Sequence, residues 1–335
     1  MVDVEEISED LRSLLMKLRF PPDSETVKET KEILAELLKR YSYAKLNRIL
    51  KTLGITSSLY YWCLKLDIPV RRHRDAVAIH PTRDFDGNEC EMMYLCGLIE
   101  DYNVYRRSKN RIRVQSGSTH PGFIRLTHSV FEKWGHVTET PCFSKTWQKY
   151  YMHVSVTLNT TFDFLINYKE DRVGFLDNNV KGDTVYDFVS GLIDSEGSLN
   201  IVVDANSNRT YVTIKISNTN EDIINWLQEK IGGYKSTRTN NGENLVTSKR
   251  CKPLHTLIIS YDGAITLLKK IRPRHPEKVL KVHVISRNLH NLRKAYEQLM
   301  VLNQEINREV KDYQNYIRQK YIERHGFPHP LDPNK

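Results

Sequence analysis

Asp187-Phe-Val-Ser-Gly-Leu-Ile-Asp-Ser-Glu-Gly-Ser-Leu-Asn200 is the stretch of sequence that decides the fold. Its first half, around Gly191, is small and apolar, which allows the backbone of a second helix to approach closely. Gly197 follows the acid Glu196 and can end the helix, and residues 198–203 then alternate between apolar and polar as a strand does. The stretch therefore predicts two packed helices with a carboxylate at the end of their contact.

A second, altered copy lies upstream, at Leu95-Cys-Gly-Leu-Ile-Glu-Asp-Tyr-Asn103. Its glycine, Gly97, precedes Gly191 by 94 positions, and Tyr102 stands where the later copy has Glu196. Two pairs of flanking segments are also similar, namely 123–129 with 213–219 and 157–165 with 260–268. Two copies of one unit in one chain predict a body with pseudo-two-fold symmetry.

Both copies resemble the signature of the LAGLIDADG homing endonucleases, and the resemblance covers about residues 89–275. It implies an α+β fold in which a pseudo-two-fold pair of αββαββα units forms a DNA-binding saddle. In that family, acids at the ends of the motif helices hold a divalent ion at the scissile phosphate. Glu196 would be such a catalytic and metal-binding acid, and Tyr102 is the degenerate acid position. The predicted motif-helix interface is Gly97, Leu98, Gly191 and Leu192.

One of the two expected acids is therefore missing. Tyr102 cannot replace a carboxylate as a hard anionic ligand, because a tyrosine pKa lies near 10. Asp101 is adjacent, but one residue turns a helix by about 100°, so we expect its carboxylate to point elsewhere. Glu100 falls where the family has an inner, structural acid. The family's basic residue near each active site has no counterpart at 159–160 or 262–263, which weakens the prediction of catalysis further.

Composition fits a globular protein with an anionic partner. The chain has 335 residues, 39% of them hydrophobic, and a net charge of +9 with a pI near 9.1. Such a basic balance favours a polyanion as partner, although many basic proteins bind none. The five cysteines form no CxxC pair, and no run of about 18 apolar residues is present. We expect a protein without membrane association, located in the cytoplasm and nucleoid-associated if prokaryotic.

The remaining segments suggest further domains. Residues 1–75 predict an all-α, helix-turn-helix-like module, with a plain three-helix bundle as the alternative. Residues 76–88 are a predicted linker, 89–180 and 181–275 the two units, and 276–335 a long C-terminal helix with a loose tail. Apolar residues recur every three or four positions along that helix, so it either packs on its own domain or forms a homodimer seam.

Basic and polar residues predict the DNA contacts. Alternation along 111–115, 123–127 and 211–216 predicts strands with one apolar and one polar face. Arg125 and Lys215, 90 positions apart, would be matched positions on the polar faces, and 235–252 is a predicted polar loop. The predicted DNA-binding residues of the two units are Arg111, Arg113, Arg125, Tyr211, Thr213, Lys215, Lys235, Arg238, Lys249, Arg250 and Lys252. Those of the N-terminal module are Ser57, Ser58, Tyr61, Lys65, Arg71, Arg72 and Arg74.

These features favour a sequence-specific protein that binds double-stranded DNA and is impaired in double-strand cleavage or lacks it. A role in transcription regulation or chromosome maintenance would follow, and no cofactor would be needed for binding. The first alternative is an active or nicking homing endonuclease that uses Glu196 and Mg²⁺. The second is an RNA-binding intron maturase, a role that some relatives perform.

Overall fold

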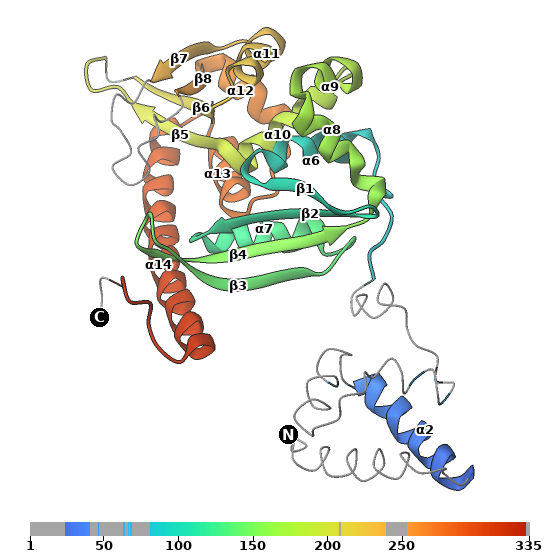
Figure 1. The fold of residues 1–335 in the computed structure, drawn as a ribbon. Coiled ribbons are helices and arrows are strands. Elements are labelled where there is room, and N and C mark those ends of the chain that lie inside the picture. The colour runs from blue at the N-terminus through green and yellow to red at the C-terminus, as the bar shows by residue number, and fades with distance from the viewer. Residues whose placement is uncertain are drawn as a thin grey trace. The chain divides into compact units, whose positions relative to one another are not determined.

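The computed structural model describes residues 24–40, 46, 63, 66, 68, 81–207, 209–238 and 253–332. The chain divides into two compact units, residues 1–81 and residues 82–335. Figure 1 shows their secondary structure. Within the described ranges, no helix is long and apolar enough to cross a membrane.

The first unit contains helix α2, Ser24–Arg40, at the place where the sequence predicts a helix. Leu34 on this helix is buried, and so are Leu46, Cys63 and Leu66. The predicted DNA-binding residues of the helix-turn-helix-like module lie outside the described residues. This applies to Ser57, Ser58, Tyr61, Lys65, Arg71, Arg72 and Arg74.

The second unit uses one pattern of elements twice (Figure 1). The first copy comprises α6 (Glu89–Leu98), the 3₁₀ turn η1 (Ile99–Asp101), β1 (Asn103–Ser108), β2 (Arg111–Ser118), α7 (Pro121–Phe131), β3 (Val137–Ser144), β4 (Lys149–Leu158), the 3₁₀ turn η2 (Thr160–Phe162), α8 (Asp163–Glu170) and α9 (Arg172–Asn179). The second comprises α10 (Thr184–Glu196), β5 (Gly197–Val203), β6 (Thr210–Asn218), α11 (Glu221–Ile231), β7 (Tyr234–Arg238), β8 (Leu254–Ser260) and α12 (Tyr261–Lys270). Both sheets are antiparallel, in the orders β1-β2-β4-β3 and β5-β6-β8-β7. The predicted α+β fold with two αββαββα units is confirmed.

The two copies meet where α6 crosses α10. A Cβ atom on Gly97 would lie 2.1 Å from the carbonyl oxygen of Phe188, and one on Gly191 would lie 2.0 Å from that of Tyr94. Phe188 follows Tyr94 by the same 94 positions that separate the glycines, so the contact is reciprocal, as pseudo-two-fold symmetry requires. Glycine is needed at both positions because any side chain would force the backbones apart.

Each sheet has one face covered by helices and one open face. In the first sheet, Val114 and Val154 point toward α7, which packs on β2, β3 and β4. In the second sheet, Ile214 and Leu257 are fully buried on the face that α11 and α12 cover. Because side chains alternate along a strand, the intervening residues lie on the opposite, open face.

Two C-terminal helices, α13 (Pro276–Arg287) and α14 (Leu292–His325), replace the single long helix that the sequence predicts. The break has a local cause. Asn288 ends α13 with φ −118°, and the Asn291 side chain accepts a hydrogen bond from the Lys294 backbone N–H to cap α14.

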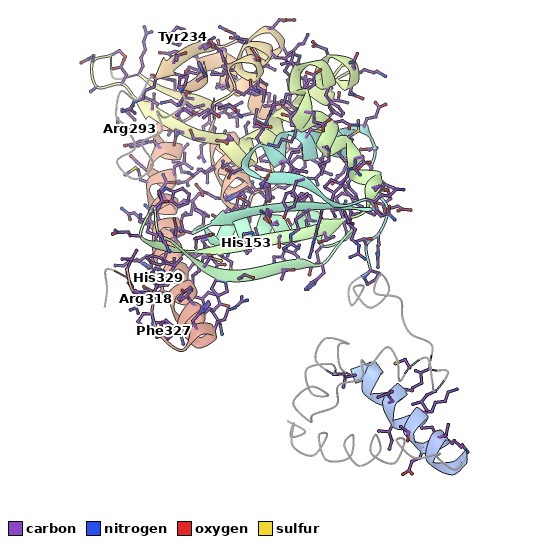
Figure 2. All side chains as sticks on the ribbon, viewed as in Figure 1. His153, Tyr234, Arg293, Arg318, Phe327 and His329 are labelled. Atoms are coloured by element: carbon purple, nitrogen blue, oxygen red, sulfur yellow. The ribbon has the colours of Figure 1, made fainter. Side chains whose placement is uncertain are left out.

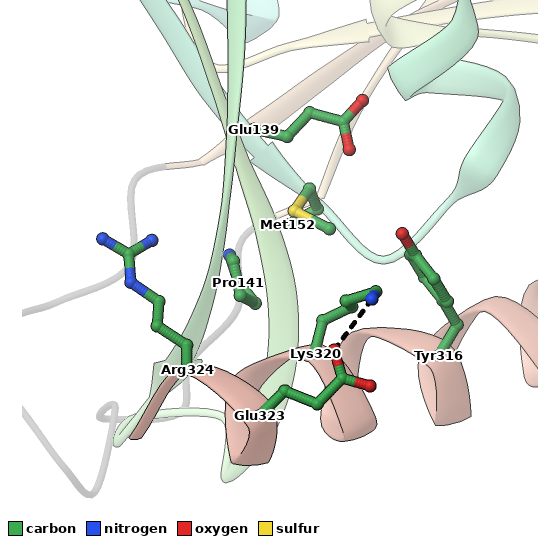
Figure 3. A pocket seen from close by; sticks show the side chains of 7 residues that line it. All are labelled: Glu139, Pro141, Met152, Tyr316, Lys320, Glu323 and Arg324. Atoms are coloured by element: carbon green, nitrogen blue, oxygen red, sulfur yellow. Dashed lines mark hydrogen bonds and ion pairs between the residues drawn. The ribbon is translucent and has the colours of Figure 1, made fainter. Parts of the chain in front are cut away.

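Helix α14 packs on its own unit, against β3 and β4 of one sheet and β5 and β6 of the other. Tyr316 and Lys320 of α14 share a cavity of about 360 Å³ with Pro141 and Met152 (Figure 3). Met152 belongs to the buried core, so α14 covers the helix side of the first sheet and leaves its other face open.

Two local predictions are wrong. Residues 123–127 lie in α7 instead of a strand, because His120 caps a helix that has Pro121 in its first turn. Residues 234–238 form strand β7, although a loop was expected from 235 onward. Within the expected linker, 76–88, Phe85 packs on Trp134, with ring centroids 5.4 Å apart.

Candidate acid cluster and nucleic-acid interface

The contact between α6 and α10 brings the C-terminal ends of both helices together. The Ser195 hydroxyl donates to the Gly97 carbonyl at 3.2 Å and so links the last turn of α10 to α6. Residues at the ends of both helices, together with the turn after β6, line a cavity of about 370 Å³. Its lining residues are Glu100, Arg172, Glu196, Asn218, Thr219, Asn220 and Glu221.

Glu196 is the last residue of α10, directly before Gly197. Burial, followed by the negative charges of Asp101 and Glu100, raises the pKa of its carboxyl to about 7. Lys169 and Lys278 oppose this effect. Glu196 is therefore a partly buried acid whose charge any bound cation would stabilise.

Glu196, Asp101 and Glu100 form what we call the acid cluster. Tyr102, at the other acid position, points away from it. Its side chain is 3% exposed and stacks on Phe123, with ring centroids 5.1 Å apart. Its hydroxyl and that of Thr127 on α7 lie 2.6 Å apart and share a hydrogen bond. Tyr102 is thus a core residue of the first copy and not a ligand that faces Glu196.

Asp101 influences the charge of Glu196, although the sequence predicts that its carboxylate points elsewhere. That expectation assumed a continuous α-helix, but α6 ends at Leu98 and a 3₁₀ turn follows. Among the charged groups that raise the pKa of Glu196, Asp101 has the largest effect. The Asp101 side chain is exposed at the surface. Partial desolvation by the surrounding protein nevertheless raises the pKa of Asp101 to about 6.

The inner acids of the two copies are both buried but have different partners. Glu100 accepts hydrogen bonds from Arg172 at 3.1 Å and from Asn218, in the other copy, at 3.0 Å, and pairs with Lys169 at 3.2 Å. Burial raises the pKa of Glu100, but the two cations outweigh that effect and leave it lowered. In the second copy, Asp194 accepts from the Tyr94 hydroxyl at 2.6 Å, and burial raises its pKa.

Two lysines, Lys278 and Lys169, place positive charge beside Asp101 and Glu196. Lys278 extends from α13 and donates to the carbonyl groups of Ile193, at 2.6 Å, and of Gly197. Lys169 extends from α8 toward Glu100. Both ammonium groups lower the pKa of Asp101 and Glu196. Neither lysine lies in a motif, so no sequence signal marks them.

The resemblance to the LAGLIDADG family implies a divalent ion at the acid cluster. The residues present fit such an ion only in part. No group of three or more His, Cys, Asp or Glu side chains in the described ranges is arranged to hold a metal. Asp101 and Glu196 offer two carboxylates, which are suitable oxygen ligands for Mg²⁺. The remaining ligands would have to be water or substrate phosphate oxygens.

The open faces of the sheets are basic and carry no carboxylate. The strands of the described chain contain a single acid, Glu139, which faces the helix side and contacts His128 on α7 at 2.8 Å. On β2, Arg113 lies opposite Tyr105 and Thr157. Figure 2 labels His153 on β4 and Tyr234 on β7, which belong to the same open faces.

Only some of the predicted DNA-binding residues lie on these faces. Those on or at the edge of an open face are Arg111, Arg113, Tyr211, Thr213, Lys215 and Arg238. Lys215 is exposed there, whereas Thr213 is 2% exposed and bonded to Ser260 at 2.6 Å. Lys249, Arg250 and Lys252 lie outside the described residues.

Two predicted contacts are wrong. Arg125 lies on α7 and forms a two-point ion pair with Glu309 of α14, at 2.6 and 3.2 Å, so it is not the counterpart of Lys215. Lys235 faces the helix side of its sheet, where it pairs with Glu221 at 2.6 Å. The alternating pattern around Arg125 belongs to a helix whose apolar face happens to include both neighbours, Ile124 and Leu126.

Comparison with known proteins finds similarity in structure but not in sequence. No protein-family model matches the chain, and none of the curated proteins matches it. The LAGLIDADG homing endonuclease I-GzeII in complex with its DNA target is 9% identical, with a TM-score of 0.35 over 63% of this chain and 96% of that one. I-SmaMI bound to an uncleaved DNA target in the presence of calcium ions is 10% identical, with a TM-score of 0.34 over 67% and 97%. I-WcaI bound to its DNA recognition sequence is 14% identical, with a TM-score of 0.37 over 57% and 86%.

Proposed function

We propose that this protein binds double-stranded DNA through the open faces of its two sheets. The observation that carries the proposal is the distribution of charge on the strands. Glu139, the one acid on the described strands, lies on the face that the helices cover. Arg111, Arg113 and Lys215 lie on the open faces. Such a surface attracts phosphates and repels none of them, which is what binding driven by counterion release needs.

Hydroxyl, amide and imidazole groups accompany the basic side chains on the open faces. Gln115 and His153 are part-exposed on the open face of the first sheet, and Asn200 is part-exposed on that of the second. Groups of this kind donate to and accept from base edges, whereas arginine and lysine mainly fix position through phosphates. The proposal therefore includes recognition of a defined sequence.

We also propose that double-strand cleavage is impaired. A symmetric cut would need equivalent acids at both helix ends, and here Glu196 ends an α-helix whereas Tyr102 is buried in the core. Binding without cutting is compatible with a role in transcription or chromosome maintenance.

A second candidate function is nicking of one strand, which the electrostatic interaction between Asp101 and Glu196 favours. With DNA bound, these two carboxylates would hold Mg²⁺ together with phosphate oxygens. The ion would polarise the phosphate and activate water. Lys278 keeps the end of α10 in place through its hydrogen bonds to Ile193 and Gly197, and so positions Glu196.

The test is to incubate the full chain with fragmented genomic DNA and Mg²⁺, recover the retained fragments, and map both enriched sequences and new ends. Enriched, intact fragments would support binding without cleavage. New ends at a fixed position that disappear in Glu196→Gln would favour the nicking function. Preferential retention of structured RNA in competition would favour the maturase alternative and contradict the proposal.

Substitutions test which surface binds. Arg113→Ala and Lys215→Ala should each weaken binding and reduce its salt dependence by about one counterion. Arg125→Ala is the matched control, because it also removes one positive charge but lies on α7 beside Glu309. If all three variants lose the same affinity, net charge and not the open faces governs binding.

A further inference from the structure

The turn between β3 and β4 carries the most exposed tryptophan of the described chain. Trp147 is 69% exposed, whereas Trp134 and Trp226 are 1% and 4% exposed. The two buried indoles donate their N–H groups to Asp86 at 2.7 Å and to Asp177 at 2.8 Å. The Trp147 indole has no hydrogen-bond partner among the described residues, so contacts within that part of the chain do not account for its position.

The turn holds a defined shape despite its exposure. The Trp147 backbone N–H donates to the Ser144 hydroxyl at 3.3 Å. Gln148 adopts φ +51°, a left-handed conformation that is strained for a residue with a side chain. Strained positions of this kind persist where a particular geometry is needed, and they are found often at binding sites.

Positive charge flanks the ring on both sides. Lys145 and Lys149 are exposed, and neither pairs with an acid in the part of the chain that the structure describes. Lys149 is opposite Ser144 at the end of the β3–β4 ladder, in register with Tyr151 and His153 on the open face. The turn therefore continues the open face of the first sheet and adds to it a large apolar ring between two cations.

We propose that the turn Lys145–Lys149 is an additional contact to duplex DNA beyond the strands, with Trp147 packed on deoxyribose and base edges and the two lysines on phosphates. The inference rests on the proposed function and specifies a part of the DNA interface that no motif marks. An aromatic ring tolerates any base beside it, and its contact area is dehydrated on binding. The turn would thus contribute affinity with little dependence on sequence.

The test measures binding of the full chain to mixed-sequence duplex DNA at low ionic strength, where binding depends little on sequence. Trp147→Ala should weaken binding about tenfold, because it removes the apolar contact area of the indole from the interface. Trp147→Phe, which keeps a ring, should restore most of the lost affinity. Phe327→Ala is the matched control, since Phe327 is 60% exposed but lies just beyond α14 (Figure 2) and should not matter.

Acrylamide quenching gives a second readout that a merely structural role would not change. The difference in fluorescence between the wild type and Trp147→Phe isolates the signal of Trp147, and duplex DNA should protect that signal from acrylamide. Two results would overturn the proposed DNA contact of the turn, provided that the wild type binds DNA. One is that Trp147→Ala binds with wild-type affinity, and the other is that acrylamide quenches Trp147 equally with and without DNA. Protection that follows protein concentration without DNA would instead indicate self-association and also overturn it. If the wild type does not bind duplex DNA at all, the proposed function itself fails.

Discussion

Glu196→Gln should stabilise this protein at alkaline pH and leave its stability unchanged in acid. Burial and the neighbouring acids raise the pKa of Glu196 from 4.5 to about 7 in the folded state. The folded chain therefore binds this proton more tightly than the unfolded chain does. Near pH 4 the carboxyl is protonated in both states and costs nothing. As the pH rises from 4.5 through 7 the cost of ionising it develops, and it is complete above about pH 8.

The size of the effect follows from the two pKa values. The change from 4.5 to about 7 corresponds to about 3 kcal/mol of unfolding free energy at roughly 1.4 kcal/mol per pKa unit. Because Glu196 is only partly buried, we expect about 2–3 kcal/mol. Glutamine has nearly the same size and no charge, so the substitution removes this cost without opening a cavity.

The assay is urea unfolding of the wild type and Glu196→Gln near pH 4 and near pH 8, with a chelator present so that no divalent cation offsets the charge. Glu170→Gln is the control, because Glu170 is a solvent-exposed residue at the end of α8. Its midpoint should follow the wild type at both pH values. If Glu196→Gln gains the same stability at both pH values, or none near pH 8, the carboxyl is not held in an unfavourable site and the reasoning about the acid cluster is refuted.

Two further substitutions test the fold around the cluster. Tyr102→Asp should destabilise the protein by about 3 kcal/mol or more, because it places a carboxyl in the core beside Phe123. It should not create DNA cleavage. A variant with wild-type thermal stability would contradict this prediction. Gly191→Ala should cost about 3 kcal/mol, since its Cβ atom would lie 2.0 Å from the Tyr94 carbonyl oxygen. Gly263→Ala is the control and should change the melting temperature far less, because its Cβ atom would meet only the Ile259 Cγ2 methyl group, at 3.3 Å.

The two acid positions show which structural details a sequence motif predicts and which it does not. The sequence correctly indicates that Tyr102 supplies no carboxylate, because residue type alone settles that. It predicts that Asp101 points away from Glu196 from the rotation per residue of a continuous α-helix, whereas the chain tightens into a 3₁₀ turn at this point. The 3₁₀ turn Ile99–Asp101 packs against α10 of the other copy, a contact that the local sequence does not reveal.

The predictions for Lys215 and Arg125 have different outcomes for a similar reason. Lys215 lies on a strand between buried residues, so alternation places it on the open face. Arg125 has apolar neighbours on both sides, and a run of five residues such as 123–127 fits a strand or a helix equally well. Residues beyond that run, beginning with Pro121, decide for the helix.

The sequence by itself determines the two copies, their symmetric contact at Gly97 and Gly191, and the loss of one acid, because these depend on residue identity at a fixed spacing. Tertiary structure decides which groups surround Glu196. Asp101 approaches through a turn of altered pitch, and Lys278 comes from a helix more than 80 positions further along the chain. Distances between groups so far apart in sequence are fixed only when the helices pack, so the charge of the cluster is a property of the fold and not of the motif.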